Sequence, residues 1–126
     1  MSLLATLFLL TAAPAAAPAS AEAANEIVVI ARKLRNWRGQ LEQVDGALAC
    51  RTKKSSGDRA VDAIGCEAMV ACYTPLQPEL NRIAAADLGR AEKKRRLAEG
   101  AQSAVPCLEQ HHDAGVARLA AQRAGQ

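Results

Sequence analysis

Aromatic side chains are almost absent from this sequence. Its 126 residues include one Phe, one Trp and one Tyr. Proteins that bind single-stranded nucleic acids stack the bases on aromatic rings, and beyond the first apolar segment only Trp37 and Tyr73 could serve in this way. We therefore expect no nucleic-acid partner.

Recognisable catalytic motifs are missing as well. The chain contains no Gly-x-Ser-x-Gly nucleophile elbow and no glycine-rich phosphate loop. Much of its hydrophobic content is alanine, which leaves few large side chains to enclose an apolar substrate pocket. The sequence thus favours a protein that is not an enzyme and that needs no cofactor.

Long hydrophobic runs are limited to the N-terminus. Residues 1–13 are uncharged and match the apolar region of a secretory signal peptide, but they are too few for a membrane span of about 20 residues. Small residues at Ala19 and Ala21 suit cleavage after Ala21, and cleavage after Ala23 is a second choice. We expect residues 1–21 to be a signal peptide and residues 22–126 to form one domain. That domain would lie in the periplasm or outside the cell, with no transmembrane segment after cleavage; the alternative is a buried or membrane-anchoring helix.

Four cysteines lie in the expected exported domain: Cys50, Cys66, Cys72 and Cys107. An even number of cysteines behind a signal peptide predicts disulfides. If Cys66 and Cys72 share a helix, their Cα atoms are about 9 Å apart, beyond the roughly 7 Å that a disulfide spans. We favour the pairs Cys50–Cys66 and Cys72–Cys107, which would support a core that is thin for its length.

The apolar pattern predicts a mostly helical α+β domain, in which a small N-terminal β element precedes about three helices. Residues 26–31 are rich in β-branched side chains and predict a strand. Residues 34–49 fit a helix, because apolar residues recur at spacings of three and four. They also fit a β-hairpin that turns at Asp45-Gly46 and pairs Leu41 with Cys50, and we favour the hairpin.

The three helices are expected after residue 57. The first begins at the N-cap Asp58 and buries Val61, Ile64, Ala68 and Cys72. The second spans residues 78–99 and stops at Gly100, and its expected inner positions are Leu80, Ile83, Ala84, Leu88 and Ala91. The third runs from residue 105 or 106 to 124, with Val105, Leu108, His112, Val116 and Leu119 facing inward.

Positive charge is concentrated in two clusters. Residues 32–59 contain eight basic and three acidic residues, a net charge of +5, and residues 90–96 contain five basic residues and Glu92, a net charge of +4. Such clusters attract anions, and the loop ahead of the Asp58 helix could hold a phosphate or carboxylate on its backbone N–H groups. The candidate anion-binding residues are Arg51, Lys53, Lys54, Ser55, Ser56 and Arg59. The alternative is a solvated charged face that aids solubility.

A metal site is the competing interpretation of the cysteines. Cys107 and His111 are one helical turn apart, and together with Cys66 and Cys72 they would make a tetrahedral Cys3His zinc site. The short Cys-x2-Cys pairs of zinc signatures are missing, and export favours oxidation of the thiols. We therefore favour disulfides and predict no metal.

Two resemblances accompany these patterns. About 40 residues in the middle of the chain resemble small four-cysteine exported proteins of alphaproteobacteria, which implies export and disulfides and assigns no site. The residues that carry it are Trp37-Arg38-Gly39, Cys50-Arg51-Thr52, Ser55-Ser56-Gly57-Asp58, Asp62-Ala63-Ile64-Gly65-Cys66, Met69 and Cys72. Residues 26–33 are similar to the TonB-box region of outer-membrane receptors, which implies a segment that adds a strand to an energy-transducing partner.

The sequence therefore favours an exported, non-enzymatic binding protein with a basic surface. Its target would be an anionic envelope component or an envelope protein. One alternative is a secreted inhibitor or toxin-like factor that acts on a single protein target, and another is a metal- or thiol-dependent enzyme.

Overall fold

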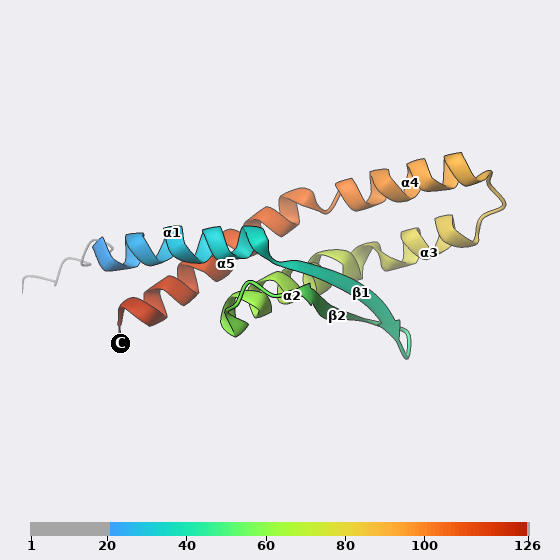
Figure 1. The fold of residues 1–126 in the computed structure, drawn as a ribbon. Helices are drawn as coiled ribbons and strands as arrows, with labels where there is room; N and C mark the ends of the chain where they lie inside the picture. Colours follow the sequence, from blue (N-terminus) through green and yellow to red (C-terminus); the bar gives the residue numbers. More distant parts are fainter. Residues whose placement is uncertain (1–20, 126) are drawn as a thin grey trace, which may run out of the picture.

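The computed structural model describes residues 21–125, so the segment expected to be a signal peptide lies outside it except for Ala21 (Figure 1). Five α-helices, one short 3-10 helix and one β-hairpin follow one another along the described chain. Their bounds are α1 Ala21–Asn36, β1 Arg38–Val44, β2 Ala47–Lys54, α2 Arg59–Tyr73, η1 Thr74–Leu76, α3 Gln77–Ala85, α4 Arg90–Gln102 and α5 Val105–Ala124. The expected class, a mostly helical α+β fold with two disulfides, is confirmed.

The strand predicted over residues 26–31 is wrong, because this segment lies within α1. Ile30 is fully buried and Leu34 is 9% exposed, and their helical spacing places both on the face that packs against the core. Burial of that face outweighs the preference of β-branched residues for strands, and it leaves Val28 55% exposed on the outer side. The segment similar to a TonB box is therefore helical in this structure.

The β-hairpin forms as predicted. Asp45 and Gly46 both have positive φ angles, of 51° and 80°, as a two-residue turn of type I′ requires. Leu41 pairs with Cys50, which is the expected register. One face of the hairpin is partly buried against α2, and the other is exposed.

The helix predicted for residues 78–99 is instead two antiparallel helices, α3 and α4, joined by residues 86–89 (Figure 1). Ala86 has an extended backbone, with φ −69° and ψ 147°, which ends α3 and lets the chain reverse. Gly100 does not stop a helix but lies inside α4, where a Cβ atom would be 2.7 Å from Cδ2 of Leu80. The glycine therefore allows the two helices to approach closely. None of the expected inner residues of this segment is buried.

The two disulfides have the predicted pairing. Cys50–Cys66 joins β2 to α2, with a Cα–Cα distance of 5.4 Å, and Cys72–Cys107 joins the end of α2 to the start of α5, at 5.8 Å. The second bond closes the base of the segment that leaves the body as α3 and returns as α4. We call residues 77–102 the arm, because in Figure 1 they extend away from the other helices.

The core lies between α1, α2 and α5, where α1 and α5 run side by side (Figure 1). Its buried cluster consists of Ile30, Leu34, Trp37, Val61, Ile64, Val116 and Ala120. All four residues of the predicted inner stripe of α2 are buried, and Val61 and Ile64 belong to this cluster. On α5 only Val116 of the five expected residues is buried. Among the described residues, no helix has both the length and the apolar character needed to cross a membrane.

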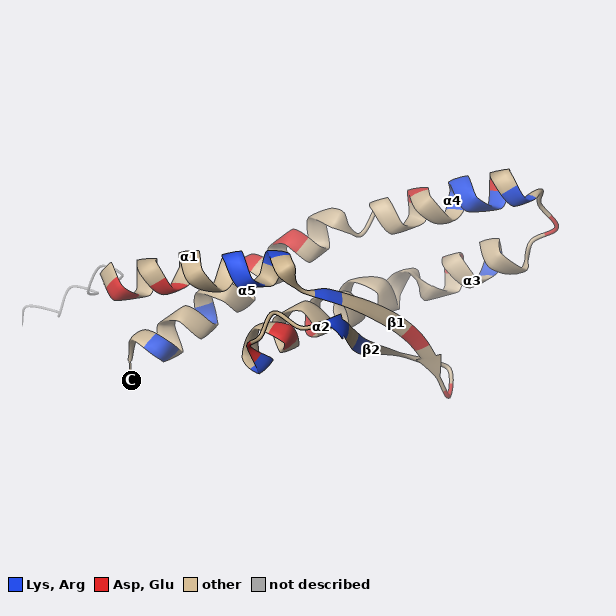
Figure 2. Ribbon diagram, in the orientation of Figure 1, with Lys and Arg blue, Asp and Glu red and all other residues tan. Residues whose placement is uncertain are grey.

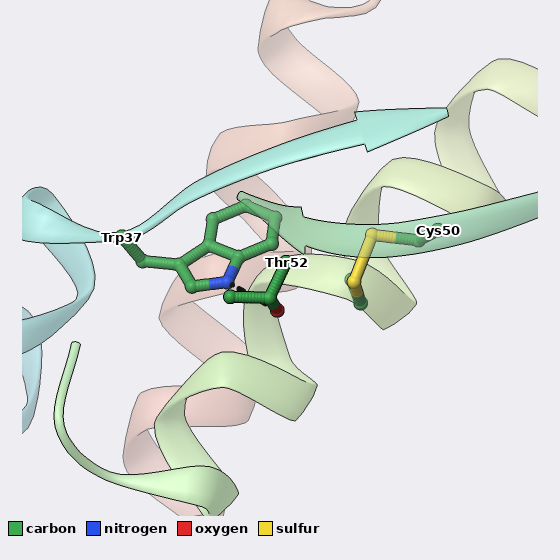
Figure 3. The surroundings of a disulfide bond; sticks show 4 residues. Trp37, Cys50 and Thr52 are labelled. Carbon is green, nitrogen blue, oxygen red and sulfur yellow. Dashed lines mark hydrogen bonds between the residues drawn. A yellow bond between two sulfur atoms is a disulfide. The ribbon is translucent and has the colours of Figure 1, made fainter. Parts of the chain in front are cut away.

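Trp37 connects the core to the hairpin. Its side chain is 7% exposed, and its Nε1 donates a hydrogen bond of 3.0 Å to Oγ1 of Thr52 on β2 (Figure 3). The ring lies directly on Gly65 of α2, where a Cβ atom would be 2.5 Å from Cε3 of the indole. Only a glycine at position 65 leaves room for the ring.

Replacing Gly65 by Ala is expected to destabilise the fold. The added methyl group collides with a buried ring, and overpacking of this kind costs about 1–3 kcal/mol, from which the better helix propensity of alanine recovers up to about 1 kcal/mol. Urea unfolding should show a net loss of about 1–2 kcal/mol. Gly89→Ala is the control for a glycine without such a collision, because no atom lies within 4 Å of its Cβ position. Gly89 is the N-cap of α4, so alanine there costs only the smaller loss of a glycine cap. An equal effect of both substitutions would contradict this account of Trp37.

Removing Cys72–Cys107 is expected to loosen the arm. In the chain-entropy model a loop of 35 residues is worth about 4 kcal/mol, and without the bond the arm is no longer closed at its base. In Cys72→Ala/Cys107→Ala, hydrogen-exchange mass spectrometry should show the largest rise in α3 and α4. In Cys50→Ala/Cys66→Ala, the largest rise should be in the hairpin. The same exchange pattern in both variants would rule out separate roles for the two bonds.

Candidate functional site

The predicted anion-binding residues lie along β2 and the loop that leads into α2. Arg51, Lys53 and Lys54 are exposed on the strand, and Arg59 is the exposed first residue of α2. The Arg51 guanidinium pairs with Glu42 across the hairpin, at 3.0 Å. The pairing is irregular at this point: Gly39 lies opposite Thr52 and Arg38 opposite Lys54, so Lys53 is the extra residue of a β-bulge.

The serines of this loop already bind a carboxylate of the chain. The hydroxyl groups of Ser55 and Ser56 and the backbone N–H of Ser56 all donate to the carboxylate of Asp62, the last at 2.8 Å. Burial alone would raise the pKa of Asp62, but the hydrogen bonds from the serines outweigh it and lower that pKa. The loop thus has the donors expected of an anion site, and an external anion would have to compete with Asp62 for them.

Asp58 holds three helices together. Its carboxylate caps α2 by accepting from the backbone N–H groups of Ala60 and Val61. The same carboxylate pairs with Lys33 of α1 at 3.1 Å and with Arg123 of α5 at 2.8 Å, and its side chain is 12% exposed. Burial favours the protonated acid, but the hydrogen bonds from Arg123 and Lys33 prevail, so the pKa of Asp58 lies below its usual 3.8. The residue predicted as an N-cap is therefore also a central ion-pair partner.

The residues considered for a zinc site are divided by the disulfides. Cys66 is bonded to Cys50, while the sulfur atoms of Cys72 and Cys107 lie within 4.8 Å of a ring nitrogen of His111. Because these sulfurs are bonded to each other, they are not thiolates that could ligate a metal ion. The neighbouring His112 is half-buried, and its Nε2 has no hydrogen-bond partner among the described residues.

The arm carries the second basic cluster on one helix (Figure 2). Glu92 pairs with Arg95 at 2.6 Å and with Arg96 at 2.9 Å, and these hydrogen bonds lower its pKa to about 2. The other three cations, Arg90, Lys93 and Lys94, form no ion pair within the described chain. They line a cavity of about 450 Å³ together with Leu88 and Leu97.

A larger cavity, of about 540 Å³, lies where α1 ends and β1 begins, against α2 and α5. This pocket was not expected from the sequence, because that prediction rested on the small number of large apolar side chains and not on where the fold places them. Trp37, Met69 and Leu108 come from three different segments and lie together in its wall. Trp37, the single tryptophan of the sequence, is the signal from which this place could have been found.

Removal of the charge on Asp58 should weaken the fold in a pH-dependent way. Because the pKa of Asp58 is lower in the folded than in the unfolded chain, the stability it adds is present above about pH 4 and is lost as the pH falls. Asp58→Asn keeps a capping side chain but removes the ion pairs, and should cost about 1–2 kcal/mol at neutral pH. Urea unfolding down to about pH 2 should show a flatter pH profile for Asp58→Asn than for the parent. Asp45→Asn is the control, since Asp45 forms no ion pair with a described residue, and its profile should match that of the parent.

Comparisons of the chain with protein-family models, with curated proteins and with solved structures found no match. The two cavities described above and the unpaired cations of the arm are the features of the chain that bear on its function.

Proposed function

We propose that this protein is an exported binding module that attaches to an anionic lipid surface of the cell envelope through its arm. The carrying observation is the side of α4 formed by Arg90, Lys93 and Lys94, three cations with no carboxylate partner in the described chain, beside Leu97. Export is supported by the apolar N-terminal segment and by the two disulfides.

The spacing of charges divides α4 into two sides. Residues 90, 93, 94 and 97 are three, four and seven positions apart and so share one face of the helix. Residues 92, 95, 96 and 99 share another face, where Arg95 and Arg96 are neutralised by Glu92 and Glu99. The free positive charge of α4 is therefore concentrated on the first face.

Leucine side chains give this face an amphipathic character. Leu88 and Leu97 are half-buried and line the cavity that the cations surround. Long basic side chains keep their charged ends in water while their stems cover apolar surface. Such a face suits a lipid surface, where head groups carry negative charge and the acyl region begins just below.

Vesicle sedimentation tests the proposal. The exported chain should bind vesicles that contain phosphatidylglycerol, and binding should weaken as salt is raised, because ions screen surface charges. Replacing Arg90, Lys93 and Lys94 by Gln should reduce the partition coefficient about a hundredfold, since each basic residue near an anionic membrane contributes about 1 kcal/mol.

The matched control is Lys53→Gln/Lys54→Gln/Arg59→Gln, which removes the same number of charges from the first basic cluster. Under the proposal it retains most of the binding. Binding that does not respond to salt, or that falls equally in both triple variants, would exclude the arm as the attachment site.

A further inference from the structure

The 540 Å³ cavity has the size and lining of a small-ligand site. Ligand pockets are typically about 300–1,000 Å³, mostly apolar, and contain a few polar groups that fix orientation. Part of the cavity wall is apolar and is formed by Trp37, Met69, Leu108 and Val116. The charged and polar groups in the lining come from Arg35, Arg38, His112 and Asp113. The cavity lies on the body of the protein, and none of its lining residues belongs to the arm.

The two arginines differ in how they are held. Nη1 of Arg38 donates hydrogen bonds to the backbone carbonyls of Arg35 and Trp37, at 2.8 and 2.7 Å. These bonds fix the guanidinium at the end of α1 and leave its other N–H groups available. The side chain of Arg35 is exposed and forms no ion pair in the described chain. Asp113 is the only acidic residue in the lining, so the charged groups sum to +1 (two Arg, one Asp).

His112 adds a polar atom that lacks a partner. Its Nε2 is buried and forms no hydrogen bond within the described chain, and a buried polar atom without a partner destabilises the fold. Desolvation lowers the pKa of His112, which favours the neutral imidazole. A bound molecule with a polar end could supply the missing hydrogen bond.

We propose that this cavity binds a medium-chain fatty acid, with its alkyl chain against Trp37, Met69 and Leu108 and its carboxylate at Arg35 and Arg38. The apolar wall favours a ligand with an alkyl chain, and the excess of positive charge in the lining favours a ligand with an anionic end. The two arginines offer planar donors that match a carboxylate. This site is separate from the arm, and it does not depend on attachment of the arm to lipid.

Fluorescence of Trp37 gives a direct measurement, because it is the only tryptophan of the chain. Titration with hexanoate, octanoate and decanoate should change its emission in a saturable way, with calorimetry as an independent readout. The affinity should rise about fourfold for each added methylene, as expected for burial of alkyl surface. Decanol, which has the same chain without the charge, should bind more weakly than decanoate.

Charge variants locate the carboxylate. Arg35→Gln should weaken decanoate binding about twofold to fivefold, and Asp113→Asn should strengthen it by a similar factor, as expected for partly exposed charges. Arg32→Gln is the matched control, because it removes an exposed arginine of the same helix that does not line the cavity. The arm variant Arg90→Gln/Lys93→Gln/Lys94→Gln should bind decanoate like the parent, even if vesicle binding is lost.

Three results would overturn the proposal. The first is the absence of both a saturable fluorescence change and calorimetric heat with all three acids. The second is decanol binding as tightly as decanoate, which would remove the role of the arginines. The third is an equal effect of Arg35→Gln and Arg32→Gln, which would show that only the net charge of the molecule matters.

Discussion

The contact between Trp37 and Gly65 determines how the hairpin lies on the helices. The indole follows directly after α1, packs on the backbone of α2, and donates its only N–H to Thr52 on β2. Most other buried side chains are aliphatic, and several are alanines, each of which removes little surface from water. One large ring therefore organises a core that is otherwise made of small parts, and the Cys50–Cys66 bond fixes the hairpin nearby (Figure 3).

The same arrangement separates a body that carries the core from an arm that carries charge. Neither α3 nor α4 contains a buried residue, so the arm gains little from burial. Its base is closed by Cys72–Cys107, and its side is joined to the hairpin by hydrogen bonds from Gln43 to Asn81 and from Gln77 to the carbonyl of Gly46. A segment with few buried contacts can expose many cations without loss to the core.

The sequence predicted best where a local signal favoured one of the alternatives. The Asp45-Gly46 dipeptide indicated the hairpin, and Asp58 indicated the start of α2. The distance limit for cysteines in one helix excluded Cys66–Cys72, and of the two pairings that remained the favoured one is correct. It failed where long-range packing decided the outcome. Residues 26–31 are helical because α5 and α2 cover one side of them, and Gly100 lies within a helix because Leu80 packs on it. The large cavity escaped prediction for the same reason, since three distant segments build it.

Counting charges along the chain also could not show which basic cluster presents its cations together. The first cluster has the larger net charge in the sequence, but Lys33 and Arg51 are paired with carboxylates and Arg38 with backbone carbonyls. Its remaining cations are distributed over three separate elements, α1, β2 and α2. In the arm, helical periodicity instead places Arg90, Lys93 and Lys94 on one face of α4. The carboxylates of Glu92 and Glu99 pair with Arg95 and Arg96 on another face of the same helix. For binding a charged surface, this arrangement matters more than the net charge of the segment.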